Sequence, residues 1–330
     1  MENSNRLMYV KAYSIPTYGA FVAQERARLT PAEQVRFDAY RKRYDENPRD
    51  KILDGFPPQL QIEPTSVCNY RCTFCFQTNE DWSNSKSGDM GFMSMDLFKQ
   101  AVDEAQGQVE ALNIASRGEP LLHPKISAML DYVAGKFVAF KLNTNGWFLT
   151  EKNAHALLEC DLMTLVISAD AASEPAYSQL RVGGKLERIV KNVERFVEMR
   201  YKHYPDSRLL LRISGVKVPG TPDLEDMQKL WGDLADQVCF TNYNPWENVY
   251  ESEENTIQEA CTDLWRRMFL WWDGTCNPCD VDYRSTLATG KFPLSKLSQV
   301  WMGDSYQELR RNHEKAQRSA CSPCRKCTVV

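Results

Sequence analysis

Three cysteines fall within eight residues, at Cys68, Cys72 and Cys75, with the spacing C-x3-C-x2-C. Thiolates this close in the chain can bind one metal group from the same side. A structural zinc site is closed by four protein ligands, and ferredoxin-type [4Fe–4S] clusters also use four cysteines. The next cysteine or histidine along the chain is His123. The triplet therefore predicts a [4Fe–4S] cluster with one iron open to another molecule, and it makes a zinc knuckle the weaker alternative.

Apolar runs typical of β-strands alternate with amphipathic helical stretches from residue 60 onward. We predict strands over 60–63, 111–115, 137–143, 162–169, 209–218 and 238–241, and helices over 95–106, 124–132, 151–158, 185–201 and 224–236. This alternation favours βαβ units with parallel strands and right-handed crossovers. Ligands of such folds collect at the carboxyl ends of the strands. On the N-terminal side of the first predicted strand, we expect a helical extension over residues 1–55. It includes a helix over 31–44 that Thr30 caps.

The cysteine triplet follows a short apolar strand, and Phe74 precedes its last cysteine. In these features the segment resembles the signature of radical S-adenosylmethionine (SAM) enzymes. The resemblance implies that SAM chelates the open iron, with Phe74 beside it. Cleavage of SAM would then give a 5′-deoxyadenosyl radical that abstracts a carbon-bound hydrogen. It also implies an α/β fold, a partial (β/α)6 TIM-like barrel over residues 56–255.

The second predicted strand leads into the run Ser116-Arg117-Gly118-Glu119-Pro120. This run resembles the family's G-G-E-P motif, whose backbone and carboxylate hold the amino group of SAM. Arg117 stands where the motif has its first glycine. The resemblance assigns Gly118 and Glu119 to SAM binding, whereas a glutamate taken by itself is more often a surface residue.

The next two strand ends carry small polar residues and an arginine follows them. Asn-Gly in the run 143–146 signals a turn by itself, and in the family such a turn lines the ribose and methionine of SAM. Relatives with a C-terminal extension also use a serine at the fourth strand end and an arginine on the following helix, and a guanidinium suits the SAM carboxylate. The matching residues, which we expect to bind SAM, are Asn143, Asn145, Ser168 and Arg181.

Three further residues are candidates for catalysis. Asp170 follows the fourth strand and, like Glu119, is a candidate acid or base. Arg212 lies on the fifth strand, and an arginine pointing into a barrel is costly unless it is paired. Cys239 lies near a strand end and is a candidate hydrogen-atom donor, although most cysteines in apolar surroundings are core residues.

Six cysteines follow residue 260, where aromatic residues also become frequent. They are Cys261, Cys276, Cys279, Cys321, Cys324 and Cys327. Asp273-Gly274 favours a tight hairpin turn just before Cys276. Residues 256–330 resemble the SPASM/twitch domain of radical SAM enzymes, which holds auxiliary [4Fe–4S] clusters.

The resemblance to the shortened twitch form implies one auxiliary cluster, bound through the spacing C-x17-C-x41-C-x2-C. Its ligands would be Cys261, Cys279, Cys321 and Cys324. Cys276 and Cys327 are then spare, and each is either an alternative ligand or a thiol donor. Four of these cysteines around a structural zinc ion are the other interpretation.

Composition excludes several classes of protein. The chain has 330 residues and a net charge of −4, so it lacks the basic character of a nucleic-acid-binding protein. No apolar run reaches the ~18 residues of a membrane span, and the N-terminus lacks the pattern of a signal peptide. At this size, and without an export signal, eleven cysteines indicate metal binding in a reducing cytoplasm rather than disulfides.

A C-terminal segment with one auxiliary cluster most resembles that of the aminocyclitol dehydrogenases and related epimerases of carbohydrate biosynthesis. We therefore expect dehydrogenation or epimerisation of a sugar or aminocyclitol, with flavodoxin or ferredoxin as the electron donor, and we favour dehydrogenation because spare cysteines are often inert. A peptide-modifying maturase is the main alternative, but the N-terminal extension is short and helical for a leader-binding domain. An iron–sulfur electron carrier or scaffold is the third, and it has no need of an open iron.

Overall fold

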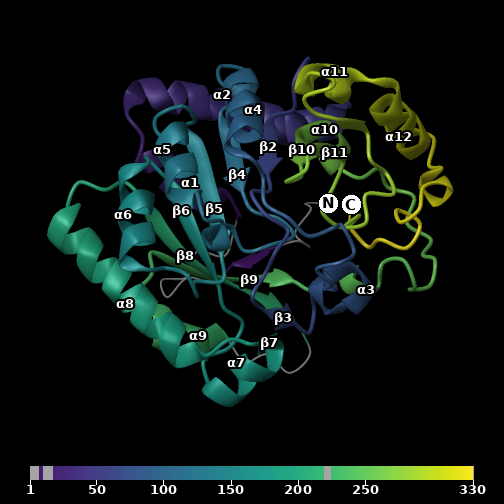
Figure 1. Ribbon diagram of the computed structural model, residues 1–330. Coiled ribbons are helices and arrows are strands. Elements are labelled where there is room, and N and C mark those ends of the chain that lie inside the picture. Colours follow the sequence, from purple (N-terminus) through teal and green to yellow (C-terminus); the bar gives the residue numbers. More distant parts are fainter. Residues whose placement is uncertain (1–6, 10–17, 219–223, 330) are drawn as a thin grey trace.

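The computed structural model describes residues 7–9, 18–218 and 224–329, and its centre is a ten-stranded open sheet (Figure 1). Six strands in the middle of this sheet pair in parallel and correspond to the six predicted from the sequence. In spatial order they are β2 (Gln59–Ile62), β4 (Ala111–Ile114), β5 (Ala139–Thr144), β6 (Thr164–Ser168), β8 (Leu210–Lys217) and β9 (Gln237–Asn242). The predicted α/β class and partial (β/α)6 barrel are therefore confirmed.

Alternation along each strand separates the two faces of the sheet. On β5, Phe140 and Leu142 are buried in the main hydrophobic core, whereas Lys141 and Asn143 point to the other face. The core lies between the sheet and the helices that cover its outer face (Figure 1). These helices are α4 (Met95–Ala105), α5 (Ile126–Val133), α6 (Glu151–Glu159), α8 (Leu186–His203) and α9 (Leu224–Trp231), all close to their predicted ranges. No described helix is long and apolar enough to cross a membrane.

The C-terminal segment extends the barrel sheet. The strand β10 (Arg267–Leu270) pairs in parallel with β2, and β11 (Thr275–Asn277) and β12 (Gly290–Lys291) continue the sheet with antiparallel pairs. The predicted turn at Asp273-Gly274 joins β10 to β11. Gly274 has φ +88°, and a Cβ there would lie 2.1 Å from the carbonyl oxygen of Phe292, so only glycine fits.

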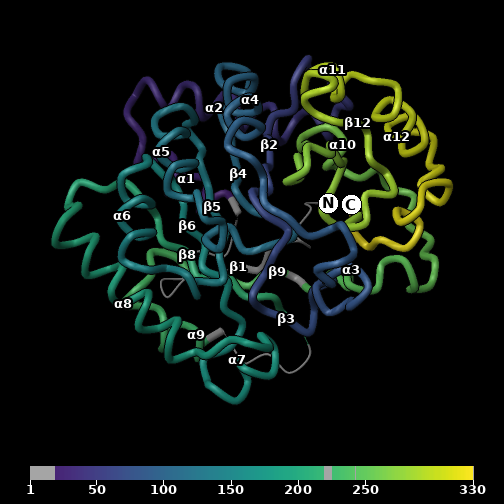
Figure 2. Tube along the Cα trace, viewed as in Figure 1, coloured from purple at the N-terminus to yellow at the C-terminus, as the bar shows by residue number. Residues whose placement is uncertain are grey.

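Helices of the C-terminal segment pack beside the first part of the chain. They are α10 (Asp263–Arg266), which contacts α2 (Pro31–Asp50), α11 (Leu297–Met302), which contacts α4, and α12 (Asp304–Glu314). The trace in Figure 2 follows the segment, in yellow, from the sheet edge back to the neighbourhood of α3 (Glu80–Ser83). There Trp82 of α3 packs in one hydrophobic cluster with Tyr283 and Cys327. The C-terminal cysteine segment is thus packed against the loop that follows β2.

The N-terminal extension consists of two described helices and one short strand. The predicted helix is α2, with the reciprocal Thr30–Glu33 capping bonds, and it ends at Asp50 rather than at residue 44 because Pro48 is accommodated in its last turn. The helix α1 (Tyr18–Ala27), which we did not predict, carries Glu25 to the face of the sheet that α4–α9 leave open. β1 (Leu7–Tyr9) pairs with the edge of β9. The domain limits at residues 55 and 255 stay predictions.

Candidate active site

The loop after β2 brings the cysteine triplet beside two polar side chains from other strands. Within this loop, β3 (Arg71–Cys72) pairs with β7 (Arg181–Val182), which places the Arg181 guanidinium 3.8 Å from the Cys72 sulfur. The side-chain amide of Asn145 lies 4.0 Å from the Cys68 sulfur, and the backbone N–H of Tyr70 lies 3.5 Å from it. Donors that point at sulfur stabilise the thiolate form, which is the form that binds metal.

The three thiols suit a cluster better than a single ion. Burial raises the pKa of Cys68 to about 12 and raises the pKa of Cys75, with the neighbouring Cys72 adding to both shifts. They are therefore protonated at neutral pH unless a metal binds. Within the described residues, no group of three His, Cys, Asp or Glu side chains is close enough to share one metal ion. In a [4Fe–4S] cluster each thiolate binds its own iron, so the sulfurs can stand farther apart.

Gly118 is required by a close approach of two backbones. A Cβ at this position would lie 2.2 Å from the carbonyl oxygen of Thr65, in the loop that carries the cysteines. The N–H of Glu119 donates to the carbonyl of Val67 at 2.9 Å. The unusual backbone angle falls one residue before the substituted glycine of the motif, at Ser116, which has φ +145°. The motif after β4 therefore lies directly against the triplet loop.

The Glu119 carboxylate joins the ends of β4 and β5. It accepts hydrogen bonds from the hydroxyl of Thr144 at 2.6 Å, the backbone N–H of Asn145 at 2.7 Å and the N–H of Leu121 at 2.9 Å. Burial raises its pKa in spite of these donors. The structure thus brings Gly118, Glu119 and Asn145, three of the residues expected to bind SAM, together beside Cys68.

Asp170 and Arg181 form a buried ion pair at the other side of the triplet. The Arg181 Nε contacts Asp170 Oδ2, and Asp170 Oδ1 accepts the N–H of Val216 at 2.6 Å. The guanidinium also lies 5.6 Å from the ring centroid of Phe74. The expectation that Arg181 lies on a helix was wrong: it caps α7 (Glu174–Leu180) and begins β7. This position turns it toward Cys72.

Asn143 and Ser168, both expected to bind SAM, lie on β5 and β6. The Asn143 Oδ1 is buried and accepts no hydrogen bond from the described residues. Ser168 ends β6 and is half-buried. An orphaned buried acceptor of this kind is where a bound hydroxyl or amine fits.

Arg212 and Cys239 face α1 and not the triplet loop. Arg212 donates to Gln237 at 2.6 Å and pairs with Glu25 of α1 at 3.3 Å, so its charge is balanced as a buried arginine requires. Cys239 is 1% exposed and packs on Phe21 of the same helix. The sequence analysis did not predict α1, and it therefore did not predict that this helix covers Arg212 and Cys239.

Five of the six C-terminal cysteines gather at one place. Burial raises the pKa of Cys279, and the neighbouring thiols of Cys324, Cys327 and Cys261 add to the shift. Cys321 lies beside Cys324 in the same way. These are the four predicted ligands together with Cys327.

Cys276, the sixth, is different. It is fully buried in the main core, and its sulfur points at the carbonyl of Gly274, 3.9 Å away. It lies on β11, opposite Gly290 of β12.

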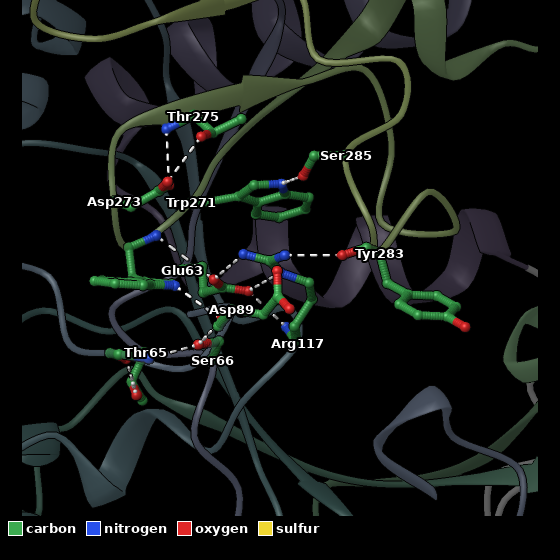
Figure 3. A network of polar contacts seen from close by, with 12 residues as sticks. Glu63, Thr65, Ser66, Asp89, Arg117, Trp271, Asp273, Thr275, Tyr283 and Ser285 are labelled. Atoms are coloured by element: carbon green, nitrogen blue, oxygen red, sulfur yellow. Dashed lines mark hydrogen bonds and ion pairs between the residues drawn. The ribbon is translucent and has the colours of Figure 1, made fainter. Parts of the chain in front are cut away.

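Arg117, the residue that departs from the motif, links the chain after β2 to the C-terminal segment (Figure 3). Its guanidinium forms two hydrogen bonds with the Glu63 carboxylate, at 2.7 and 2.8 Å, and donates to the carbonyl oxygen of Tyr283 at 2.9 Å. The indole ring of Trp271 lies 4.3 Å from it. We did not predict this contact; an arginine in place of a motif glycine, with a glutamate after the preceding strand, was its only sequence signal.

Comparison with known proteins identifies the class to which this fold and these motifs belong. A family model of the radical SAM superfamily matches residues 62–217, and one of an iron–sulfur cluster-binding domain, SPASM, matches residues 261–328. The chain belongs to the radical SAM superfamily and carries a C-terminal SPASM domain. SAM and a [4Fe–4S] cluster are the cofactors of the first domain, and auxiliary iron–sulfur clusters are those of the second.

Curated relatives match this chain over different lengths. A tungsten-containing aldehyde ferredoxin oxidoreductase cofactor-modifying protein of Pyrococcus furiosus is 32% identical over 34% of this chain and 30% of its own length. Matches to GTP 3′,8-cyclases also span less than half of those proteins. The S-adenosyl-L-methionine-dependent 2-deoxy-scyllo-inosamine dehydrogenase of Niallia circulans is 22% identical, over 84% of this chain and 95% of its own.

Solved structures share the fold. BtrN in complex with AdoMet and 2-DOIA aligns with a TM-score of 0.57 at 17% identity, over 84% of this chain and 95% of that chain. Streptococcus suis SuiB bound to the precursor peptide SuiA aligns with a TM-score of 0.57 at 16% identity, over 92% of this chain and 74% of that chain. Identities this low establish the architecture alone.

Proposed function

We propose that this protein is a radical SAM dehydrogenase that oxidises a carbinol of a sugar or aminocyclitol to a ketone. The observation that carries the proposal is the match to an aminocyclitol dehydrogenase over 84% of this chain and 95% of the relative. The shorter matches leave most of the relative outside the alignment. A relative aligned over nearly its whole length includes both cluster-binding segments, so it is the best guide to the reaction.

The reaction balances with one external electron. The cofactors would supply the radical chemistry: reductive cleavage of SAM would give methionine and a 5′-deoxyadenosyl radical, and an auxiliary cluster would accept one electron. The hydrogen atom of the carbinol carbon would pass to this radical and give 5′-deoxyadenosine. Loss of the hydroxyl proton and of one electron then gives the ketone. The first electron comes from a donor such as flavodoxin or ferredoxin, in a reducing cytoplasm.

We also propose that residues around the triplet bind SAM, and their positions support this assignment. Gly118 and Glu119 lie against the triplet loop, so we assign them to the SAM amino group, and Arg181 to its carboxylate. Asn143, Asn145 and Ser168 would line the ribose and methionine, beside Phe74. Cys68, Cys72 and Cys75 would hold the first cluster.

The base that removes the hydroxyl proton stays open. Glu119 already accepts three hydrogen bonds. Asp170 is paired with Arg181, and Arg212 is paired with Glu25. Each candidate would have to exchange a partner for the substrate, so we assign none of them.

For the auxiliary cluster we propose the ligands Cys261, Cys279, Cys321 and Cys324. The gathering of these thiols supports this set, and it makes Cys327 the alternative ligand. The burial of Cys276 in the main core, away from these thiols, argues against a role in the cluster or as a hydrogen donor. Cys239, under Phe21, is a poor donor for the same reason.

A peptide substrate is the second candidate. It is favoured by the alignment of 92% of this chain with a SuiB structure that holds its precursor peptide. An electron carrier is disfavoured, because such a protein has no need of a cluster with one iron open to another molecule.

Product analysis in deuterated water tests the proposal. The reconstituted enzyme, with SAM and a chemical reductant, is offered a library of sugars and aminocyclitols and, separately, a peptide library. A ketone formed with one 5′-deoxyadenosine per turnover supports dehydrogenation. A deuterium-bearing epimer would make the enzyme an epimerase, and modification of peptides alone would overturn the proposal.

A further inference from the structure

A buried arginine stands at the centre of the C-terminal cysteine loop. Arg318 lies in the short helix η4 (Arg318–Ala320), three residues before Cys321, and is 1% exposed. Its guanidinium donates to the carbonyl oxygens of Cys324 at 2.9 Å, Cys327 at 2.6 Å and Val329 at 2.7 Å. A fourth bond, at 3.3 Å, reaches the carbonyl of Glu259, two residues before Cys261. One side chain therefore ties together the backbone on both sides of the cysteine group.

The charge of this arginine has no carboxylate partner among the described residues. No ion pair of Arg318 exists in that part of the chain, and all four of its acceptors are neutral carbonyls. A guanidinium keeps its charge in proteins, and a buried charge without a counter-charge is costly. The bond from its Nε to the Cys324 carbonyl, at 2.9 Å, keeps the guanidinium next to a predicted cluster ligand. We therefore expect the negative charge that balances Arg318 to lie at the cysteines whose backbone it contacts.

An iron–sulfur cluster bound by these cysteines would supply it. A [4Fe–4S] cluster with four thiolate ligands carries a net negative charge, which grows when the cluster is reduced. The potential of such a cluster depends on net charge, on hydrogen bonds to the sulfurs and on exposure to solvent. A fixed cation beside it favours the reduced form, and burial of the cation strengthens the effect.

Two carboxylates lie near the cysteines, but neither of them pairs with Arg318. Asp282 lies near Cys279 and accepts hydrogen bonds from Tyr250, Thr286 and the N–H of Leu287. Glu308 lies near Cys321. Lys51 adds a second cation near Cys261. Its ammonium donates to the carbonyl of Pro48 and lies 4.2 Å from the ring of Trp265.

We propose that Arg318 raises the reduction potential of the auxiliary cluster and so makes that cluster an electron acceptor. The role rests on the proposed dehydrogenation, in which one electron leaves the substrate after the hydrogen atom. Arg318 is a positioning and electrostatic residue, because it contacts the loop that carries the ligands and not the substrate. Its positive charge, rather than its hydrogen bonds alone, is what sets the potential.

A redox titration followed by electron paramagnetic resonance tests this role without any substrate. The background is the protein with Cys68, Cys72 and Cys75 changed to Ala, so that only the auxiliary cluster contributes. We compare Arg318→Gln, which removes the charge, with Arg318→Lys, which keeps it but loses most of the fork of donors. Arg325→Gln is the control, because Arg325 lies next to Cys324 on the surface and is paired with Glu254 at 3.3 Å.

The expected result is a lower midpoint potential in R318Q, a potential close to that of the parent in R318K, and a smaller shift in R325Q. A potential in R318Q that equals that of the parent or of R325Q would overturn the proposal. If R318Q binds no iron, R318K decides: a strongly lowered potential there, with the charge kept, would also overturn it. None of these outcomes depends on which substrate is oxidised, so failure here differs from failure of the proposed reaction.

Discussion

The Arg117 guanidinium and the Glu63 carboxylate form a two-point ion pair in which the side chains are 5% and 0% exposed. Glu63 follows β2, and Arg117 belongs to the motif that follows β4. Through Tyr283 and Trp271 the same guanidinium reaches the SPASM segment. The residue that departs from the family motif thus links the motif after β4 to the SPASM segment.

Removing one partner of this pair should destabilise the fold strongly. Arg117→Met leaves the Glu63 carboxylate buried without its cation, a change that costs about 3–5 kcal/mol. Urea denaturation measures the free energy of unfolding. Arg36→Met is the control, since Arg36 and Glu110 form an exposed pair with side chains 47% and 23% exposed, and such pairs contribute about 0–1 kcal/mol. Equal losses in the two variants would refute the argument.

The double variant Arg117→Met, Glu63→Met separates charge from packing. When both charges are removed, no unpaired charge stays buried, so it should regain part of the stability that Arg117→Met loses. A double variant less stable than R117M would mean that the Glu63 carboxylate stabilises the fold mainly through the hydrogen bonds it accepts from the backbone N–H groups of Arg117 and Trp272.

Iron content distinguishes one auxiliary cluster from two. Anaerobic reconstitution should give about eight iron and eight sulfide per chain, as two [4Fe–4S] clusters. Changing Cys68, Cys72 and Cys75 together to Ala should leave about four iron and abolish SAM cleavage. Cys276→Ala should keep the full iron content, because the thiol lies in the main core. About twelve iron in the parent protein would contradict a single auxiliary cluster.

The SAM pocket is tested by two variants that retain the cluster. Glu119→Ala and Arg181→Ala should each weaken SAM binding, measured by calorimetry on the reconstituted protein, while the iron content stays the same. Loss of one charge-assisted contact corresponds to roughly 1.5–3 kcal/mol, or about a tenfold to hundredfold weaker affinity. Arg26→Ala, at an exposed pair with Asp38, is the control. Unchanged affinity in both variants would place the pocket at other strand ends.

Local sequence was enough for the parts of the fold that short-range pattern determines. Alternating apolar residues and helix caps are local, and they predicted all six parallel strands and the N-cap at Thr30. The strand β10 was missed, because the aromatic stretch around Phe269 becomes a strand only by pairing with β2, more than 200 residues away. Contacts of this range leave no periodic signal in the chain.

The same distinction holds for the site. Spacing located the triplet, and the structure places Glu119 and Asn145 beside it. The partners of the charged residues were not predictable, because Arg212 is balanced by Glu25 from α1 and Asp170 by Arg181. Asp170, which the sequence offered as a candidate acid or base, therefore proves to be one half of an ion pair with Arg181.

The contribution of Glu33 to the free energy of unfolding should decrease at acid pH, because its partners Arg208 and Thr30 stabilise the charged carboxylate. The hydrogen bond from Arg208, at 2.5 Å, and the Thr30 cap lower the pKa of Glu33 from 4.5 to about 2. A lowered pKa in the folded state stabilises the protein fully above pH 4.5, and this contribution is lost as the pH falls toward 2. The difference in free energy of unfolding between the parent protein and Glu33→Gln should therefore be larger at about pH 6 than at about pH 3. Urea denaturation at both values measures it. A difference that is the same at both would show that Glu33 acts through hydrogen bonds that do not need its charge.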